Sequence, residues 1–253
     1  MPKVITIVSQ YSNTGKTTTL INFSSWLGLL GKKVLIIDLD SQSVATDFLL
    51  NTNKKVETIE DVILEQIPLD SVILDTSVKG LSLIPSTHDA ANVGLETLFD
   101  TDIFSLKDSI DLLEEDFDYI FLDIAGGIIS NTYKSCLVAS DQVFISLKGE
   151  AEEIENIHNL INSIAQIKSE YNNWLELSGM ILTLYNNQSS FSSQMLTKIR
   201  ENFGDLLYKS TISRNNLILE SCNQKVPVVM YDIKSFGAES YLRLAKEFIQ
   251  NNI

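Results

Sequence analysis

Hydrophobic residues along the chain fall into two kinds of run that alternate. Short apolar runs rich in β-branched residues predict strands at 4–8, 34–37, 81–84, 119–122, 142–146 and 179–184. Longer segments with apolar positions every three to four residues predict helices at 16–30, 59–65, 103–114, 150–167, 192–203 and 237–250. This alternation predicts an α/β fold, a doubly wound and mostly parallel sheet with helices on both faces. The pattern is weakest over 51–81.

The length of 253 residues fits one α/β domain, and we expect a single domain over 1–253. No linker-like stretch, internal repeat or low-complexity segment interrupts it. No apolar run approaches the ~20 residues that span a bilayer, and the first residues enter a strand pattern without a signal peptide. We therefore expect a soluble protein of the cytoplasm.

Cysteine and histidine positions do not indicate a disulfide framework or a zinc site. Cys136 and Cys222 lie far apart, and His88 and His158 each stand alone without metal-ligand spacing. This agrees with a cytoplasmic protein.

The charge of the chain is unevenly distributed. A formal net charge of −14 argues against a nucleic-acid partner, because such binding depends on Lys and Arg neutralising phosphates. Positions 186–253, however, hold eight basic and six acidic residues, a net of +2, whereas the first 185 positions carry a net of −16. The three arginines of the chain, Arg200, Arg214 and Arg243, all lie in the last quarter.

A phosphate-binding motif follows the first predicted strand, where positions 9–19 read SQYSNTGKTTT. The general form G-x-x-x-x-G-K-[ST] would place a glycine at Gln10, so only its second half is present. The context fits, because an apolar strand, a turn and a helix start point backbone amides and the helix dipole at phosphate. The alternative is a threonine-rich helix start that serves only as a cap.

Three side chains of this motif have specific expected roles. Lys16 would reach the β- and γ-phosphates, the Thr17 hydroxyl would hold Mg²⁺, and Thr18 would bond an α-phosphate oxygen. These groups predict a site for nucleotide phosphates and Mg²⁺.

Carboxylates follow two further predicted strands. KKVLIIDLD ends a buried strand with Asp38 and Asp40, and FDYIFLDIAGG ends another with Asp123, followed by Gly126 in a loop that could approach a γ-phosphate. Ligands of open α/β sheets bind at the carboxyl ends of the strands. Each aspartate alone could be a turn former, but three motifs in this order make coincidence improbable.

These motifs, with LSLIPSTHDAANVGLETL, ASDQVFISLKGE, TISRNNLILES and VPVVMYDIKSFGAESYLRLA, resemble the ParA/MinD family of deviant Walker ATPases. The resemblance covers nearly the whole chain and is strongest to short, Soj-type ParA proteins without an N-terminal extension. It implies a P-loop NTPase fold of the deviant Walker type and hydrolysis of ATP.

The resemblance also implies further site residues. Ser12, Asn13, Thr14 and Gly15 would wrap the phosphates together with Lys16, Thr17 and Thr18. Asp38 and Asp123 would hold the water shell of the metal, and Asp40 would orient the attacking water. The loop from Ile212 through Arg214 to Asn215 would line the adenine.

The phosphate-binding loop departs from the family at one functional position. The family loop resembles K-G-G-x-G-K-[ST]-T, whose first lysine reaches the phosphates of the dimer partner, but here Tyr11, Ser12 and Asn13 replace its first three residues. Where relatives usually read V-Q-P-E, this chain reads LKGE, so Lys148 could supply the missing charge in trans. The same exchange characterises the carboxysome-distributing McdA proteins. A solvated surface lysine is the alternative.

The resemblance implies partners as well. One partner is a second copy of the chain, which would bind in the presence of ATP. Another is DNA, bound without sequence preference through the basic excess after position 186. The third is an adaptor protein that stimulates hydrolysis and links the protein to a cargo distributed over the nucleoid. The cargo could be a carboxysome, a plasmid or a chromosome. The alternatives are a MinD-like membrane-associated ATPase with an amphipathic tail at 240–253, a small-molecule P-loop ligase and an iron-sulfur reductase ATPase. No membrane partner is expected, because the tail has few cations.

Overall fold

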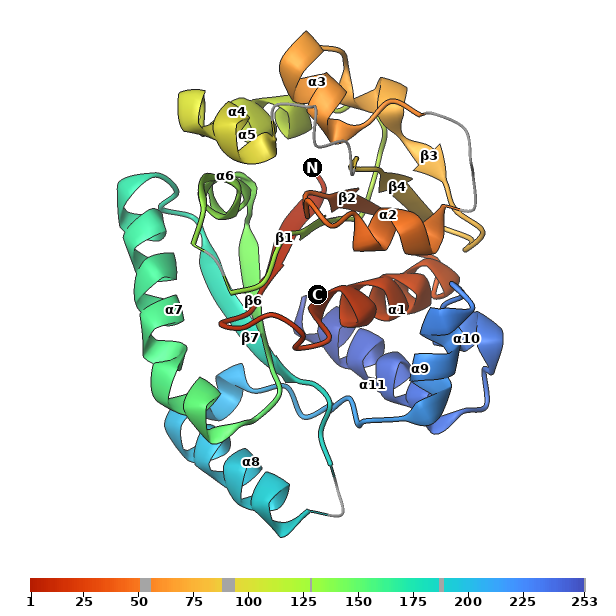
Figure 1. Ribbon diagram of the computed structural model, residues 1–253, viewed down its shortest axis with the longest axis vertical. Helices are drawn as coiled ribbons and strands as arrows, with labels where there is room; N and C mark the ends of the chain where they lie inside the picture. The colour runs from red at the N-terminus through yellow and green to blue at the C-terminus, as the bar shows by residue number, and fades with distance from the viewer. Residues whose placement is uncertain (51–55, 88–93, 128, 187–188, 253) are drawn as a thin grey trace.

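A single sheet forms the centre of the computed structural model, which describes residues 1–50, 56–87, 94–127, 129–186 and 189–252 (Figure 1). Within these residues the sheet has seven strands in the order β3-β4-β2-β5-β1-β6-β7. Their bounds are β1 Lys3–Val8, β2 Val34–Asp38, β3 Leu74–Asp75, β4 Leu81–Ile84, β5 Tyr119–Asp123, β6 Gln142–Leu147 and β7 Glu176–Leu182.

All neighbouring strands are parallel except β3, which runs antiparallel to β4. From β1 the chain moves to β2 on one side, while β6 and β7 lie on the other side of β1. The connections therefore change direction at β1, and ligands of such sheets bind beyond the carboxyl ends of the strands at this point.

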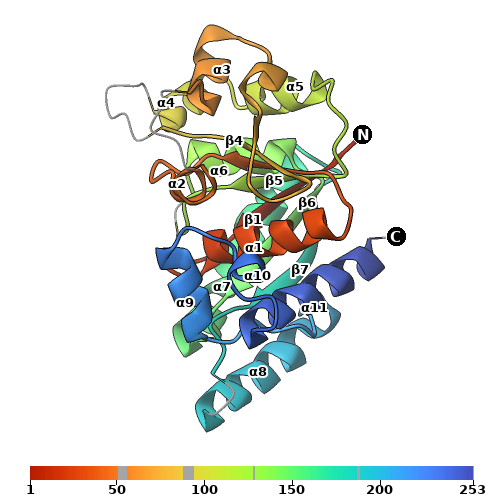
Figure 2. The same cartoon turned by 90° about the vertical axis from the view of Figure 1, so that its right-hand side faces the viewer.

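Helices cover both faces of the sheet, and each face has its own apolar core. One face carries α3 (Ile59–Glu65), α4 (Leu95–Thr101), α5 (Ser105–Asp111), α6 (Asn131–Ala139), α7 (Ala151–Glu170) and α8 (Ser190–Phe203). The other carries α1 (Lys16–Leu29), α2 (Val44–Leu49), α9 (Asn216–Asn223), α10 (Val228–Tyr231) and α11 (Phe236–Asn251). Figure 2 shows α3 and α5 near one end of the molecule and α8 at the other.

Strand β1 shows why a strand inside this sheet is apolar at nearly every position. Val4 and Val8 pack in the core of one face, and Ile5 and Ile7 pack in the core of the other. Successive strand residues point to opposite faces, so a strand covered on both sides favours apolar residues on both faces. The exception in β1 is Thr6, which is buried and shares a hydrogen bond with Ser140 Oγ at 2.7 Å. The predicted fold class, a doubly wound and mostly parallel sheet, is confirmed.

Several predicted element bounds were wrong. The strand expected at 179–184 is Glu176–Leu182, and Leu184 lies beyond it with φ +52°. The helix expected at 103–114 is only Ser105–Asp111. The prediction also missed β3, α2, α4, α6, α9 and α10, which have two to nine residues and are too short to show a clear period. Positions 51–55 and His88 lie outside the described residues.

Cys136 lies on α6 and is fully buried, as its apolar sequence neighbours suggested. Burial raises the pKa of its thiol. Such a thiol is a packing residue rather than a cluster ligand. No helix among the described residues is both long enough and apolar enough to cross a bilayer.

Candidate functional site

The loop between β1 and α1 leaves the start of α1 open to an anion. Gly15 is the residue before the helix, with φ +74°, and no side chain caps this end. The first turn of α1 contains no acidic residue, so its free backbone amides and dipole favour a negatively charged ligand. Asn13 has φ +58°, a conformation that asparagine tolerates where the family has glycine.

The middle of this loop is held by a hydrogen bond from the residue that follows β7. Thr14 is 1% exposed, and its carbonyl accepts a hydrogen bond from Thr183 Oγ1 at 2.5 Å. Ser12 and Asn13 are exposed. The loop therefore combines a fixed base with accessible residues at its tip.

Two carboxylates meet at the carboxyl edge of the sheet. Asp38 ends β2 and Asp123 ends β5, and they are partners in the register of these parallel strands. Both are completely buried. Asp38 accepts hydrogen bonds from the Thr46 amide at 2.8 Å, the Thr46 hydroxyl at 2.7 Å and the Asp40 amide at 3.1 Å. The structure thus brings together two aspartates that the sequence placed at the ends of separate strands.

Burial, together with the nearby charge of Asp123, raises the pKa of Asp38 from 3.8 to about 7. The hydrogen bonds from Thr46 and Asp40 oppose this rise. Two buried carboxylates this close together resist being ionised at the same time.

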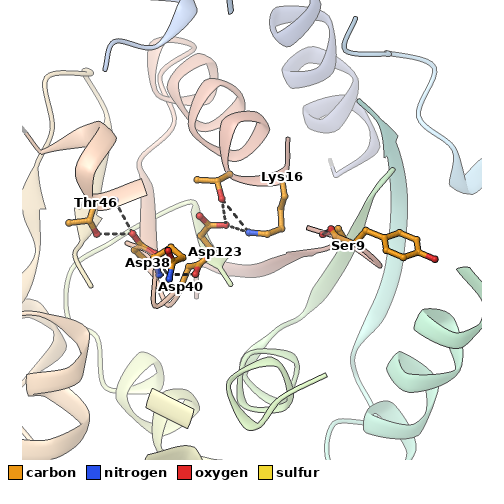
Figure 3. A network of polar contacts seen from close by, with 9 residues as sticks. Ser9, Lys16, Asp38, Asp40, Thr46 and Asp123 are labelled. Carbon is orange, nitrogen blue, oxygen red and sulfur yellow. Dashed lines mark hydrogen bonds and ion pairs between the residues drawn. The ribbon is translucent and has the colours of Figure 1, made fainter. Parts of the chain in front are cut away.

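Asp123 is the centre of a small polar cluster. Its Oδ1 forms an ion pair with Lys16 Nζ and accepts a hydrogen bond from Thr17 Oγ1 at 3.3 Å (Figure 3). Its buried Oδ2 has no hydrogen-bond partner among the described residues. Hydroxyl and carboxylate oxygens converging in this way fit a hard cation such as Mg²⁺.

Asp40 lies beside this cluster and is 9% exposed. Its Oδ1 accepts a hydrogen bond from the Gln42 amide at 3.0 Å, which leaves the carboxylate at the edge of the site. The loop after β5 packs against the phosphate-binding loop, since the Gly127 amide donates to the Ser9 carbonyl at 3.1 Å. The two loops are therefore in direct contact.

A cavity of about 590 Å³ opens beside the start of α1. Its lining includes five predicted site residues, Gly15, Thr18, Lys148, Arg214 and Asn215. Asn215 also caps α9, since its side chain accepts a hydrogen bond from the Leu217 amide at 2.8 Å. Arg214 is exposed. The volume suits a small-molecule ligand.

Comparison with known proteins gives the family. Residues 2–177 match the AAA domain family described as AAA_31. The chain is 31% identical to the sporulation initiation inhibitor protein Soj of Bacillus subtilis, over 99% of this chain and 100% of that protein. It is also 31% identical to the chromosome partitioning protein ParA of Caulobacter vibrioides, over 98% of this chain and 94% of that protein.

The chain belongs to the ParA/MinD family of deviant Walker ATPases. Its fold is similar to that of Cyanothece apo McdA, with a TM-score of 0.84 and 20% identity over 98% of this chain and 100% of that one. It is similar as well to cobyrinic acid a,c-diamide synthase of Mycobacterium smegmatis, with a TM-score of 0.82 and 22% identity over 99% of this chain and 95% of that one. At these identities the structures show a common fold alone.

Three residues of this ParA-family site were not predicted from the sequence. Thr46 holds Asp38, Thr183 holds the phosphate-binding loop, and Glu153 holds the loop that carries Lys148. A threonine eight positions after a strand-terminal aspartate gives no periodic signal. Only the folded chain brings these partners together.

Lys148 is half-buried and lines the large cavity together with Gly15 and Thr18. A second cavity of about 170 Å³ is lined by Lys148, Tyr11, Glu150 and Glu153. Lys148 therefore lies close to Tyr11, the position where relatives carry the loop lysine. Among the described residues its ammonium has no ion-pair partner.

Proposed function

We propose that this ParA-like ATPase hydrolyses ATP with Mg²⁺, forms a dimer around two ATP molecules and distributes a cargo over the nucleoid. The observation that carries the proposal is the convergence of Lys16, Thr17 and Asp123 at the uncapped start of α1, with Asp38 beside them. A positive charge, a hydroxyl and two carboxylates at an anion-accepting helix end are the groups that a metal-bound phosphate chain requires.

The ion pair between Lys16 and Asp123 supports specific roles for both residues. When phosphates occupy the loop, Lys16 would leave Asp123 and bind the β- and γ-phosphates. Mg²⁺ would be held by the Thr17 hydroxyl and, through water, by Asp38 and Asp123, where it neutralises phosphate charge. Ser12, Asn13, Thr14, Gly15 and Thr18 would surround the phosphates, with Arg214 and Asn215 toward the adenine.

Asp40 would orient the attacking water. It is the least buried of the three aspartates, and its backbone is fixed by the hydrogen bond to Asp38. A carboxylate at the edge of the site can accept a proton from water without disturbing the buried pair.

Lys148 would complete the site of the partner subunit. The first 199 residues contain no arginine that could act on a phosphate, so lysines must neutralise the charge that develops during transfer. The ammonium of Lys148, which has no ion-pair partner within the part of the chain that the structure describes, is near the position of the absent loop lysine, which supports this role. The dimer would then form only when ATP is present.

The proposed partners outside the dimer are DNA and an adaptor protein. The relatives named as chromosome partitioning proteins and the basic excess after position 186 support DNA binding without sequence preference. The cargo would be a carboxysome, a plasmid or a chromosome, reached through an adaptor that stimulates hydrolysis. The protein would act in the cytoplasm, at the nucleoid.

The membrane-bound alternative is weaker because the C-terminal helix already uses its apolar face. Leu244 and Phe248 are buried in the core, and Leu242 and Ile249 pack against the same core. A helix that inserts into lipid needs such residues free. A small-molecule ligase would consume ATP only with its substrate and would ignore DNA, so DNA pelleting with ATP, ADP and no nucleotide separates it from a partition ATPase.

Light scattering tests the proposed dimer. With Mg²⁺ and a slowly hydrolysed ATP analogue the mass should double, and with ADP the protein should remain a monomer. Lys16→Ala should abolish nucleotide binding, and Asp40→Ala should retain binding and dimerisation but stop hydrolysis. Equal dimerisation with ADP and with the ATP analogue would contradict the proposal.

A further inference from the structure

A buried carboxylate lies in the first turn of α7, directly behind Lys148. Glu153 is 2% exposed, and its Oε2 accepts hydrogen bonds from the amides of Lys148 at 2.7 Å and Gly149 at 3.0 Å. The contact with the Glu150 amide is longer, at 3.5 Å. Glu153 and the N-cap residue Glu150 form a capping box, in which each side chain accepts the backbone amide of the other, but the shorter contacts of Glu153 are to the two residues before this N-cap.

The backbone at this point is shaped to receive an anion. Gly149 has φ +75°, and consecutive amides of a loop that reverses in this way point toward one centre. Glu153 fills that centre with its own carboxylate. Its other oxygen, Oε1, is buried and has no hydrogen-bond partner among the described residues.

This arrangement keeps the Lys148 ammonium available. The carboxylate of Glu153 binds the backbone of Lys148 rather than its side chain. The main chain of Lys148 is therefore held in place. Within the described part of the chain its ammonium has no ion-pair partner, and the residue lines the cavity of about 590 Å³ beside the start of α1. A charge held in place loses less conformational entropy when it binds phosphate than one on a mobile loop.

The next turn of α7 contacts the phosphate-binding loop. Asn156 Nδ2 donates a hydrogen bond to the Tyr11 hydroxyl at 3.1 Å. Residues three positions apart lie on the same face of a helix, so Glu153 and Asn156 present one face to both loops. That face connects Lys148 to Tyr11, where relatives carry the lysine that this chain lacks.

We infer that Glu153 is a positioning residue that fixes the Lys148 loop against the phosphate-binding loop and so makes Lys148 competent to act on a triphosphate. The inference rests on the proposed function, because it concerns the same lysine. Glu153 was not predicted from the sequence, and its side chain binds backbone amides of this chain.

The test compares Glu153→Ala with Glu153→Gln, which retains an oxygen that can accept the two amides. Glu153→Ala should weaken dimerisation on an ATP analogue with Mg²⁺ by at least about tenfold, while the affinity of the monomer for ADP stays within about twofold. Glu153→Gln should restore dimerisation to within about threefold of wild type. Ser235→Ala, which removes the cap of α11, is the control for a loss of helix stability alone.

A second measurement reports on the loop itself. Trypsin cleaves after lysine, and mass spectrometry can follow cleavage of the bond after Lys148 in the folded, nucleotide-free protein. Glu153→Ala should raise the rate at this bond at least about fivefold, whereas Ser235→Ala and Glu153→Gln should not. If Glu153→Ala fails to fold, Glu153→Asp takes its place, because a shorter side chain cannot reach both amides.

Two results would overturn the inference. One is wild-type dimerisation in Glu153→Ala. The other is a parallel loss of ADP binding and dimerisation of the same size as in Ser235→Ala. If the wild-type protein does not dimerise on ATP, the proposed function fails. If wild type and Glu153→Ala both dimerise while Lys148→Ala does not, only the inference about Glu153 fails.

Discussion

Asp38 is a titrating residue that burial keeps protonated near neutral pH. Its pKa is 3.8 in an unfolded chain and about 7 in the folded protein, chiefly because of burial. Between about pH 4 and pH 7 the folded form retains a proton that the unfolded chain has released. The free energy of unfolding therefore loses a contribution as the pH rises through this window, and the loss is complete above it.

Asp38→Asn should remove this pH dependence, because an amide does not titrate. In urea unfolding without metal or nucleotide, the stability of wild type relative to the variant should fall by about 1 kcal/mol per pH unit between about pH 5 and pH 7. The difference cancels the contributions of carboxylates that do not interact with position 38. A difference that is constant across this range would show that Asp38 is ionised throughout.

At the scale of elements, the contact between two loops governs the site. A Cβ on Gly126 would lie 2.7 Å from Ser9 Oγ and 2.9 Å from the Tyr11 carbonyl, so only glycine lets the loop after β5 approach the phosphate-binding loop. Gly126→Ala should therefore separate the loops, lower stability by about 1–3 kcal/mol and reduce ATP turnover at least about tenfold.

Gly94→Ala is the matched control, because a Cβ at Gly94 would meet no atom within 4 Å. Because Gly94 is the N-cap of α4, its replacement by alanine should lower stability by up to about 1 kcal/mol, but its turnover should be unchanged. Calorimetry and a phosphate-release assay measure both quantities. Full turnover in Gly126→Ala would mean that the two loops do not act together.

Two kinds of element could be predicted from the sequence: long helices, and strands that are buried on both faces of the sheet. Strand β2 and helix α1 are examples, since the strand is apolar up to its last residue and the helix has 14 residues, of which 11 are buried. The short helices α2, α6 and α9 were missed because six to nine residues contain too few turns to reveal a period. Leu184 was assigned to a strand because it is apolar, but there the chain turns toward the cavity.

Some residues of the candidate site could likewise be predicted from the sequence, and others could not. Asp38 and Asp123 were predictable because each ends an apolar strand, and parallel strands bring such ends together. Thr46, Thr183 and Glu153 act through hydrogen bonds to the backbone or to a buried carboxylate. Their partners depend on how loops pack in three dimensions, which no spacing in the sequence encodes.

At the scale of the molecule, the basic excess gathers around the C-terminal helices. Helices α8, α9, α10 and α11 lie together in the lower half of Figure 2. Of the three arginines, Arg243 pairs with Glu239 at 2.8 Å and Arg214 lines the cavity, which leaves Arg200 on α8 as the best candidate for DNA contact. Lys198 is exposed on the same helix.

Charge reversal on α8 tests this surface. Lys198→Glu with Arg200→Glu should weaken DNA binding and reduce the slope of log K against log salt by about one unit per lost phosphate contact. Lys32→Glu with Lys107→Glu makes the same change in net charge elsewhere and should have little effect. Both variants should retain ATP-dependent dimerisation, and equal DNA retention by the two would exclude α8 as the contact surface.

The central claim is that Lys148 of one subunit completes the ATP site of the other. Lys148→Ala alone should not dimerise or hydrolyse ATP efficiently, and Asp40→Ala alone should dimerise without hydrolysis. In a mixed dimer, the site with an intact Asp40 receives an intact Lys148 from the partner subunit. Mixing the two inactive variants should therefore restore hydrolysis, up to about a quarter of the wild-type rate in an equal mixture. If Lys148 acts within its own subunit, every site in the mixture lacks one of the two residues. A mixture as inactive as its separate components would contradict the claim.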